Sequence, residues 1–198
     1  MELKEMKVKI TLLEEMLGTA SGNPEIHEEF IASKAPDAPS REEEIEALGV
    51  DEVVAKDKTV FPRDAEGRPI LWDYQIKGFM KDACGMLRKV SGSESSKVKA
   101  YKKEIDGLIF VSPRAIPIVF DGEVGECQRP LRAQTAQGER VALANSETVP
   151  AGSTLEFTVQ MLTNDDKLVK EWLDYGVLRG LGQWRNSGKG RFEYELVS

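Results

Sequence analysis

The sequence predicts a single α+β domain over residues 1–198, with the element order strand, helix, strand, strand, helix, strand. Apolar and polar residues alternate at the start of Val8–Leu17 and throughout Thr154–Met161, which is the period of a half-buried strand. Apolar residues recur at helical spacing in Trp72–Val90 and in Leu168–Val177. A chain of 198 residues that is 40% hydrophobic and 31% charged is also long enough and apolar enough to build one sizeable core.

The first predicted strand, Val8–Leu17, is followed by a long insertion. Val8, Ile10 and Leu12 share one face of this strand, which ends at Gly18. Residues 19–69 are rich in acids and turn formers and lack a sustained apolar period. We therefore expect residues 19–69 to be an insertion and not part of the core.

The remaining elements follow the insertion in order. Asp73 is the predicted N-cap of the first helix. Leu108–Val111 and Ala115–Phe120 are predicted strand segments on either side of a break at Pro113, and residues 121–150 are predicted to form a long hairpin or protrusion. The second helix begins after Asn164 or Asp165, either of which can cap it, and the last strand is Phe192–Val197.

The segment Gly180–Gly190 carries four glycines in a Gly-x-Gly-x5-Gly-x-Gly frame between the second helix and the last strand. Glycine tolerates left-handed backbone and leaves main-chain N–H groups accessible, so such a loop can cradle phosphate. Trp184, Arg185 and Lys189 add a stacking surface and positive charge, which suits nucleic acid better than a mononucleotide. A glycine-rich turn with no ligand is the alternative interpretation.

Charge is unevenly distributed along the chain. The net charge is −7, but residues 25–57 alone carry eleven acids and three bases, so the rest of the chain is close to neutral at +1. Residues 74–103 carry eight bases and two acids, and residues 179–191 carry four bases and no acid. Local basic patches of this kind can bind phosphate despite a negative total, although the four lysines of Lys97–Lys103 are better explained as a solvated loop or helix face.

Several classes of protein are disfavoured by the sequence. Cys84 and Cys127 are in no CxxC pair, so we expect neither a metal site nor a disulfide, and no cofactor is predicted. No apolar run approaches the length that spans a bilayer, and the first residues do not resemble a signal peptide. The sequence therefore predicts a cytoplasmic protein without a membrane partner.

The predicted element order is the split β-α-β arrangement of ferredoxin-like (RRM-like) domains. Four segments in this order resemble the RAMP superfamily of CRISPR-associated proteins, most closely the Csm-type backbone RNA-binding subunit of type III effector complexes. They are the first strand and its loop, a Gly-Arg-Pro stretch entering the first helix, a Glu-x-Val-Pro-x-Gly entry to a core strand, and the glycine loop: Leu17–Gly22, Gly67–Gly78, Glu147–Phe157 and Gly180–Gly190. Tyr74 and Gln75 stand where the family commonly has two serines.

The resemblance implies a ferredoxin-like palm with a β-hairpin thumb, formed here by residues 121–150. Such a protein assembles with copies of itself or with related CRISPR subunits along single-stranded guide RNA and contacts the RNA backbone. The nucleic-acid-binding residues expected from the resemblance and from the basic loop segments are Lys77, Gly78, Lys81, Arg132, Arg140, Gly180, Gly182, Trp184, Arg185, Gly188, Lys189 and Gly190.

Catalysis is not predicted. The type III backbone subunit cuts target RNA with an Asp in the loop after the first strand, and residues 18–25 contain none. Glu25 is a weak substitute, and His27, a candidate general base, lies among acids that repel RNA. Two alternatives to a binding protein therefore stay open: a metal-independent endoribonuclease that processes guide RNA, and a virus-encoded relative that interferes with CRISPR complexes.

Overall fold

The structure is a computed structural model that describes residues 3–21, 58–135, 138–163 and 166–197. The chain divides into two compact units. The first unit comprises Met1–Met16, Pro62–Glu123 and Val149–Ser198, and the second comprises Leu17–Phe61 and Val124–Thr148. The mixed α+β class predicted from the sequence is confirmed. Most of the predicted insertion, at residues 22–57, lies outside the described residues.

The first unit is built on a four-stranded antiparallel sheet in the order β11-β1-β10-β6. These strands are β1 (Lys4–Leu12), β6 (Ile109–Ser112), β10 (Thr154–Met161) and β11 (Phe192–Leu196). The alternation predicted for β1 and β10 is confirmed, since every second residue of each is buried. The first strand, however, runs from Lys4 to Leu12 and not from Val8 to Leu17, because the chain turns at the acidic pair that follows Leu13.

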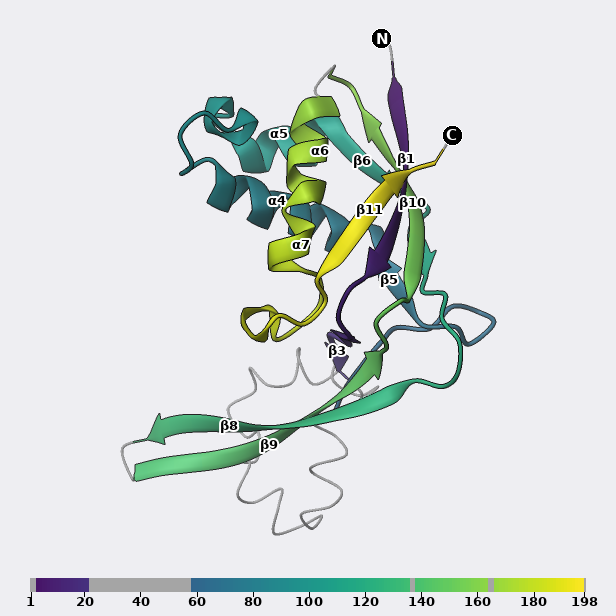
Figure 1. Cartoon of the computed structure of the whole chain (residues 1–198), viewed down its shortest axis with the longest axis vertical. Helices are drawn as coiled ribbons and strands as arrows, with labels where there is room; N and C mark the ends of the chain where they lie inside the picture. The colour runs from purple at the N-terminus through teal and green to yellow at the C-terminus, as the bar shows by residue number, and fades with distance from the viewer. Residues whose placement is uncertain (1–2, 22–57, 136–137, 164–165, 198) are drawn as a thin grey trace, which may run out of the picture. The chain divides into compact units, whose positions relative to one another are not determined.

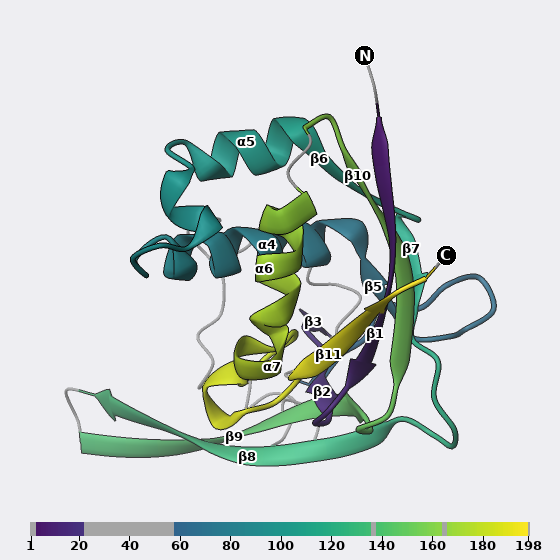
Figure 2. The same ribbon diagram turned by 45° about the horizontal axis from the view of Figure 1, so that its top comes forward.

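Helices cover one face of this sheet (Figures 1 and 2). They are α4 (Asp73–Leu87), α5 (Tyr101–Leu108), α6 (Asp166–Asp174) and α7 (Gly176–Arg179). Of the apolar residues that predict the first helix, Ile76, Phe79, Met80 and Ala83 are buried, whereas Met86 and Val90 are exposed. Phe79 meets Phe192 of β11 edge to face at 5.2 Å, and Trp172 of α6 is fully buried. None of the described helices is both long and apolar enough to cross a membrane.

The start of α4 differs from the prediction. Asp73 is the first helical residue, and Trp72 occupies the N-cap position. The backbone N–H of Trp72 donates to the side-chain oxygen of Gln75 at 2.7 Å, which is half of a capping box. The carboxylate of Asp73 instead accepts from the N–H of the next residue, Tyr74. The N-cap prediction for Asp73 is therefore wrong by one residue.

A two-stranded sheet accompanies the main one. It pairs β5 (Ile70–Trp72) with β7 (Ala115–Pro117). The two strand segments predicted on either side of Pro113 therefore belong to different sheets, β6 to the main sheet and β7 to this one. A short 3-10 helix, η1 (Glu94–Lys97), lies between α4 and α5. Neither β5 nor α5 is predicted by the sequence, since each contributes too few buried residues to show a period.

The second unit contains a long hairpin of β8 (Gly125–Thr135) and β9 (Gly138–Val149), which pair antiparallel from Gly125↔Thr148 to Thr135↔Gly138. The short strands β2 (Met16–Leu17), β3 (Ala20–Ser21) and β4 (Thr59–Val60) complete its sheet. Strand β4 runs parallel to β9, with Thr59 opposite Ser146 and their hydroxyls 2.7 Å apart. The segment predicted as a hairpin or protrusion thus contains a regular hairpin.

Candidate nucleic-acid interface

The glycine loop joins α7 to β11. Its two ends, at Gly180–Leu181 and at Gly190, lie close together and form the neck of the loop. Gly180 and Gly190 have φ of 75° and 71°, a left-handed backbone that favours glycine. The N–H of Leu181 donates to the carbonyl of Gly190 at 2.9 Å, and a Cβ on Gly190 would lie 1.9 Å from the carbonyl oxygen of Leu181. Close approach of two backbone segments therefore explains both outer glycines.

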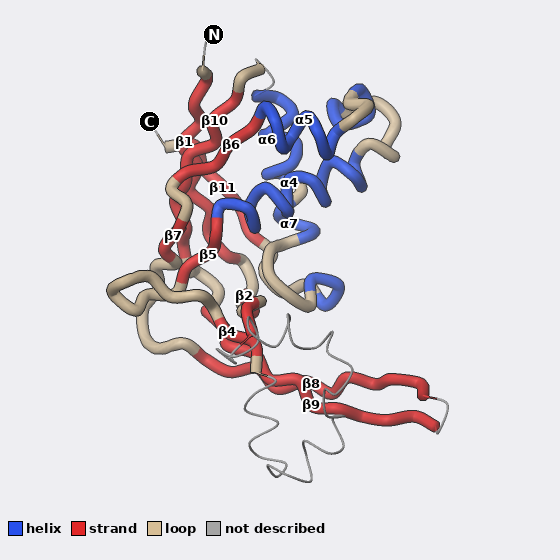
Figure 3. The backbone as a smooth tube through the Cα atoms, turned by 180° about the vertical axis from the view of Figure 1, so that it is seen from behind, coloured by secondary structure: helices blue, strands red, loops and turns tan. Residues whose placement is uncertain are grey.

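The tip of the loop is a single turn, visible in Figure 3 between α7 and β11. Trp184 has φ 54° and ψ 33°, a left-handed conformation that is unusual for a residue with a side chain, and η2 (Arg185–Ser187) follows it. A left-handed residue followed by right-handed ones turns successive N–H groups to the same side, which favours an anion. The indole of Trp184 is 43% exposed. The tip therefore presents amides, an aromatic ring and a guanidinium together.

A hollow of about 340 Å³ accompanies the tip. It is lined by Arg179, Gly182, Gln183, Trp184, Arg185 and Asn186. The predicted residues Gly182, Trp184 and Arg185 are thus brought together, and Gly188 ends the turn with φ 86°.

Asp82 of α4 holds the arginines of this hollow. Its carboxylate accepts from Nε of Arg179 at 2.8 Å and from Nη1 of Arg185 at 2.9 Å. Burial alone would raise the pKa of the Asp82 carboxyl, but the hydrogen bond from Arg179 and the charge of Arg185 outweigh it and hold this pKa below its usual range. The carboxylate stays ionised at neutral pH and ties the loop to α4.

Two further acids meet the bases at the end of the loop. Lys189 pairs with Glu15, and Arg191 pairs with Glu14 at 3.1 Å. The N–H of Gly190 also donates to the carbonyl of Glu15 at 2.8 Å. The four bases of residues 179–191, which have no acid among them in sequence, are therefore met by three carboxylates from elsewhere. The loop keeps a smaller positive excess than the sequence predicts.

Lys77, Gly78 and Lys81 lie on α4, and the two lysines contact residues of α5 and β6. The ammonium of Lys77 donates to the carbonyl of Asp106 at 3.2 Å and lies 5.1 Å from the centre of the Phe110 ring. Lys81 pairs with the Asp106 carboxylate at 2.5 Å. Asp82 is five positions after Lys77, which places the two residues about 140° apart around the helix axis. Lys77 therefore extends from one side of α4, and the glycine loop contacts α4 on a different side, through Asp82.

The face of the sheet opposite the helices carries mixed charges. On the central strands β1 and β10 the outward residues are Glu5, Lys7, Lys9, Thr11, Thr154, Glu156, Thr158 and Gln160. The single aromatic residue of these two strands, Phe157, is buried. RRM domains bind RNA by stacking bases on aromatics of this face. β1 and β10 therefore present no aromatic ring on this face for such stacking.

The other predicted residues lie elsewhere. Arg132 and Arg140 are in the β8–β9 hairpin of the second unit, where Arg132 is opposite Val141 and Arg140 is opposite Ala133. His27 and Glu25 fall outside the described residues. Within the described part of the chain there is no cluster of His, Cys, Asp and Glu suited to hold a metal ion.

Sequence comparisons find no relative: no protein-family model matches the chain, and no curated protein matches it. Structure comparison does find similar folds. The chain is similar in fold to a chain of a CRISPR type III-B complex. That structure is described as the cryo-EM structure of the Type III-B Cmr-beta bound to cognate target RNA; the TM-score is 0.53 and the sequence identity 13%. The match covers 100% of this chain and 60% of the other, so this chain spans about three fifths of its length.

A second similar chain comes from a Type IV-B CRISPR complex, with a TM-score of 0.48, 11% identity, and coverage of 98% of this chain and 91% of that one. At such identities the comparison with the type III-B chain concerns the fold and carries no residue across.

Sequence reasoning missed the acids that organise this region. Asp82, Glu14 and Glu15 are distant in sequence from the bases they meet, and Asp82 is one of two acids in the basic stretch 74–103. A helical wheel of α4 puts Asp82 on the border of the buried face, which is the one signal that could have identified it.

Proposed function

We propose that this protein is a RAMP-like, CRISPR-associated subunit that binds single-stranded RNA, its guide, by the backbone. The observation that carries this proposal is the tip of the glycine loop, where the exposed indole of Trp184 stands beside Arg185 in a hollow fixed to α4. The likeness in fold to a chain of an RNA-bound type III-B complex supports it.

A ferredoxin-like palm is part of this proposal. Strand β10 lies between β1 and β6, the strands of the main sheet that come before and after α4 in the chain. Strand β1 likewise lies between β10 and β11, which come before and after α6. Each β-α-β unit is therefore split by a strand of the other, and this strand order supports a ferredoxin-like palm. We treat residues 1–198 as one such domain with an insertion at 19–69, and the β8–β9 hairpin as its thumb.

The binding mode follows from the chemistry of the loop. The backbone N–H groups and Arg185 suit phosphate oxygens, which are the same in every sequence. Trp184 offers a π surface on which any base can stack. Further proposed phosphate contacts are Lys77, Lys81, Lys189, Arg132 and Arg140. Gly78 leaves open space on α4 for the RNA strand. The expected ligand is a single strand bound without strong sequence preference.

The decisive experiment measures RNA affinity against salt. A labelled, unstructured RNA of about 30 nucleotides should bind the full chain, and log K should fall linearly with log salt by about 0.7 per phosphate contact. Arg185→Gln should weaken binding and make this slope shallower. Lys7→Gln, on the mixed-charge face of the sheet, is the matched control and should leave both unchanged. Salt-independent binding, or no binding to any single strand, would overturn the proposal.

A non-catalytic role is also proposed. A 2′-hydroxyl attack needs a base, a cation at the scissile phosphate and backbone alignment, and the sole histidine lies in a stretch of acids. Labelled repeat RNA incubated with and without magnesium should stay intact. Cleavage that disappears in His27→Ala would favour the processing endoribonuclease, and magnesium-dependent cleavage lost in Glu25→Ala would favour a target-cutting enzyme.

Assembly is the remaining element of the proposal. A guide-binding subunit of this kind would pack along RNA with copies of itself or with related CRISPR subunits, in the cytoplasm. Complexes with RNAs of increasing length should grow in mass by whole subunits, as measured by light scattering.

A further inference from the structure

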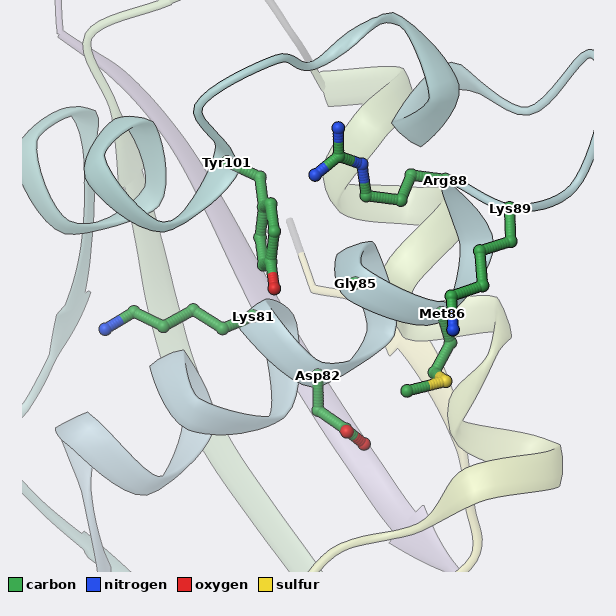
Figure 4. A pocket seen from close by; sticks show the side chains of 7 residues that line it. All are labelled: Lys81, Asp82, Gly85, Met86, Arg88, Lys89 and Tyr101. Atoms are coloured by element: carbon green, nitrogen blue, oxygen red, sulfur yellow. The ribbon is translucent and has the colours of Figure 1, made fainter.

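A second basic pocket lies on α4 and the start of α5, apart from the tip of the glycine loop. Its volume is about 520 Å³, within the range of small-ligand sites. Figure 4 shows the side chains that line it: Lys81, Asp82, Gly85, Met86, Arg88, Lys89 and Tyr101. It therefore combines three cations with an aromatic ring and a thioether.

Tyr101 is held in the middle of this pocket by α4. A Cβ added to Gly85 would lie 3.1 Å from the Tyr101 hydroxyl, so the ring rests against the helix at a position that has no side chain. Lys81 and Arg88 extend on either side of the ring (Figure 4). The guanidinium of Arg88 lies 5.2 Å from the ring centre, a cation–π contact that holds two flat groups together.

The negative charge in this pocket is already neutralised. Asp82 is the one acid of its lining, and its carboxylate is bound by Arg179 of α7 and Arg185 of the glycine loop. Arg88 and Lys89 are exposed, and no ion pair of either joins them to another described residue. Lys81 shares its charge with Asp106. A positive surplus therefore remains where the pocket opens to solvent.

A nucleotide matches this combination better than an acidic peptide does. Arginine planes and aromatic rings are the surfaces on which unpaired bases stack. Lysine and arginine side chains at the same place supply the partners of a phosphate. Carboxylates of a peptide would use the cations but leave the Tyr101 ring and Met86 without a partner.

We propose that this pocket binds a nucleoside monophosphate unit, with its base against the Arg88–Tyr101 pair and its phosphate near Lys89. The site is separate from the tip of the glycine loop, so it does not depend on the function proposed above. A free nucleotide and a nucleotide within a strand share this chemistry, and the test distinguishes them.

In the test, the full chain is titrated separately with UMP, hexauridylate and ribose 5-phosphate. Binding is measured from the NMR chemical shifts of the Arg88 and Tyr101 side chains. UMP should shift both residues, and ribose 5-phosphate should bind at least about fivefold more weakly because it has no base to stack. Hexauridylate binding more tightly than UMP indicates a strand, and equal affinity indicates a free nucleotide.

Variants separate this site from the glycine loop. Arg88→Gln and Tyr101→Leu should each weaken UMP binding at least about fivefold, whereas Lys7→Gln, on the opposite face of the sheet, should not. Because Arg88 is exposed, Arg88→Gln decides the question even if Tyr101→Leu lowers stability. Equal binding of UMP and ribose 5-phosphate, binding of hexaglutamate as tight as that of UMP, or an unchanged affinity in Arg88→Gln would overturn the proposal. Loss of binding to long RNA in Arg185→Gln alone would concern only the glycine loop.

Discussion

The carboxylate of Asp82 accepts a hydrogen bond from Nη1 of Arg185 at 2.9 Å, although 103 positions separate the two residues in the chain. Arg179 donates to the same carboxylate oxygen, and its Nη1 also donates to Asn186 at 3.1 Å. One acid of α4 therefore fixes both the base and the tip of the glycine loop. The orientation of Trp184 and Arg185 depends on this contact.

Replacing Asp82 tests that dependence. Asp82→Asn keeps the shape of the side chain but removes the charge that two arginines share, so the free energy of unfolding at pH 7 should fall by about 1 kcal/mol, as for partly exposed ion pairs. Chemical denaturation of both proteins measures the change. Asp106→Asn, which breaks only the exposed pair with Lys81, is the control for a nearby charge loss.

The Asp82 contribution should also depend on pH in a defined direction. The pKa of Asp82 is lowered in the folded state, so its stabilising effect is present above the unfolded value of about 3.9 and is lost as pH falls through the folded pKa. The stability difference between the wild type and Asp82→Asn should therefore be constant near neutrality and shrink below about pH 4. A difference that grows on acidification contradicts the ion-pair account.

The neck of the glycine loop predicts a contrast between two glycines. Gly190→Ala puts a Cβ against the backbone of Leu181, which cannot move without opening the loop, so we expect a loss of about 3 kcal/mol or more in stability. Gly67 has a similar φ of 78° but open space around it, so Gly67→Ala should cost only about 1 kcal/mol. Equal thermal shifts in the two variants would show that steric closure of the neck is unimportant.

Much of the first unit could be predicted from sequence because its elements bury a regular face. The alternation of Val8, Ile10 and Leu12 predicts β1, and the apolar spacing around Phe79 and Met80 predicts α4. The position of the glycine loop between a helix and the last strand follows from the same periods. Element type is therefore reliable where one face is buried.

The ion pairs and the minor elements could not be predicted in this way. α5 buries Ile105 alone, so no apolar period marks it as a helix. β5 has three residues, too short for an alternation. The pairing of Arg179 with Asp82 joins residues 97 positions apart, and a contact of that kind has no local signature in the sequence. The charge of the glycine loop is thus a property of the tertiary structure.

Trp184 provides a test in which stability and binding should separate. Its left-handed conformation disfavours a side chain, so Trp184→Gly relieves strain that roughly offsets the flexibility gained by the unfolded chain, and the melting temperature should change little. RNA affinity should nevertheless fall by about 1–3 kcal/mol if the indole stacks on a base. Trp184→Phe, which keeps an aromatic ring, should retain most of the affinity. A large fall in melting temperature without loss of RNA binding would assign the indole a purely structural role.

The acidic stretch of residues 25–57 should oppose RNA binding through its charge. Its net charge is −8 in a chain of net charge −7, so replacing it with a neutral Gly-Ser segment of equal length leaves the protein near +1. Repulsion of a polyanion then decreases, and RNA affinity should rise at low salt, with the gain fading as salt shortens the Debye length from about 10 Å at 0.1 M. A shuffled segment that keeps the same composition is the matched control and should bind RNA as the wild type does. Circular dichroism verifies that both variants fold.

A free peptide of residues 25–57 added in trans separates two causes of this effect. Competition of the peptide with RNA would support a segment that imitates nucleic acid, as expected of a virus-encoded relative. Absence of competition would leave long-range repulsion as the mechanism. Unchanged affinity at low salt in the neutral variant would contradict both.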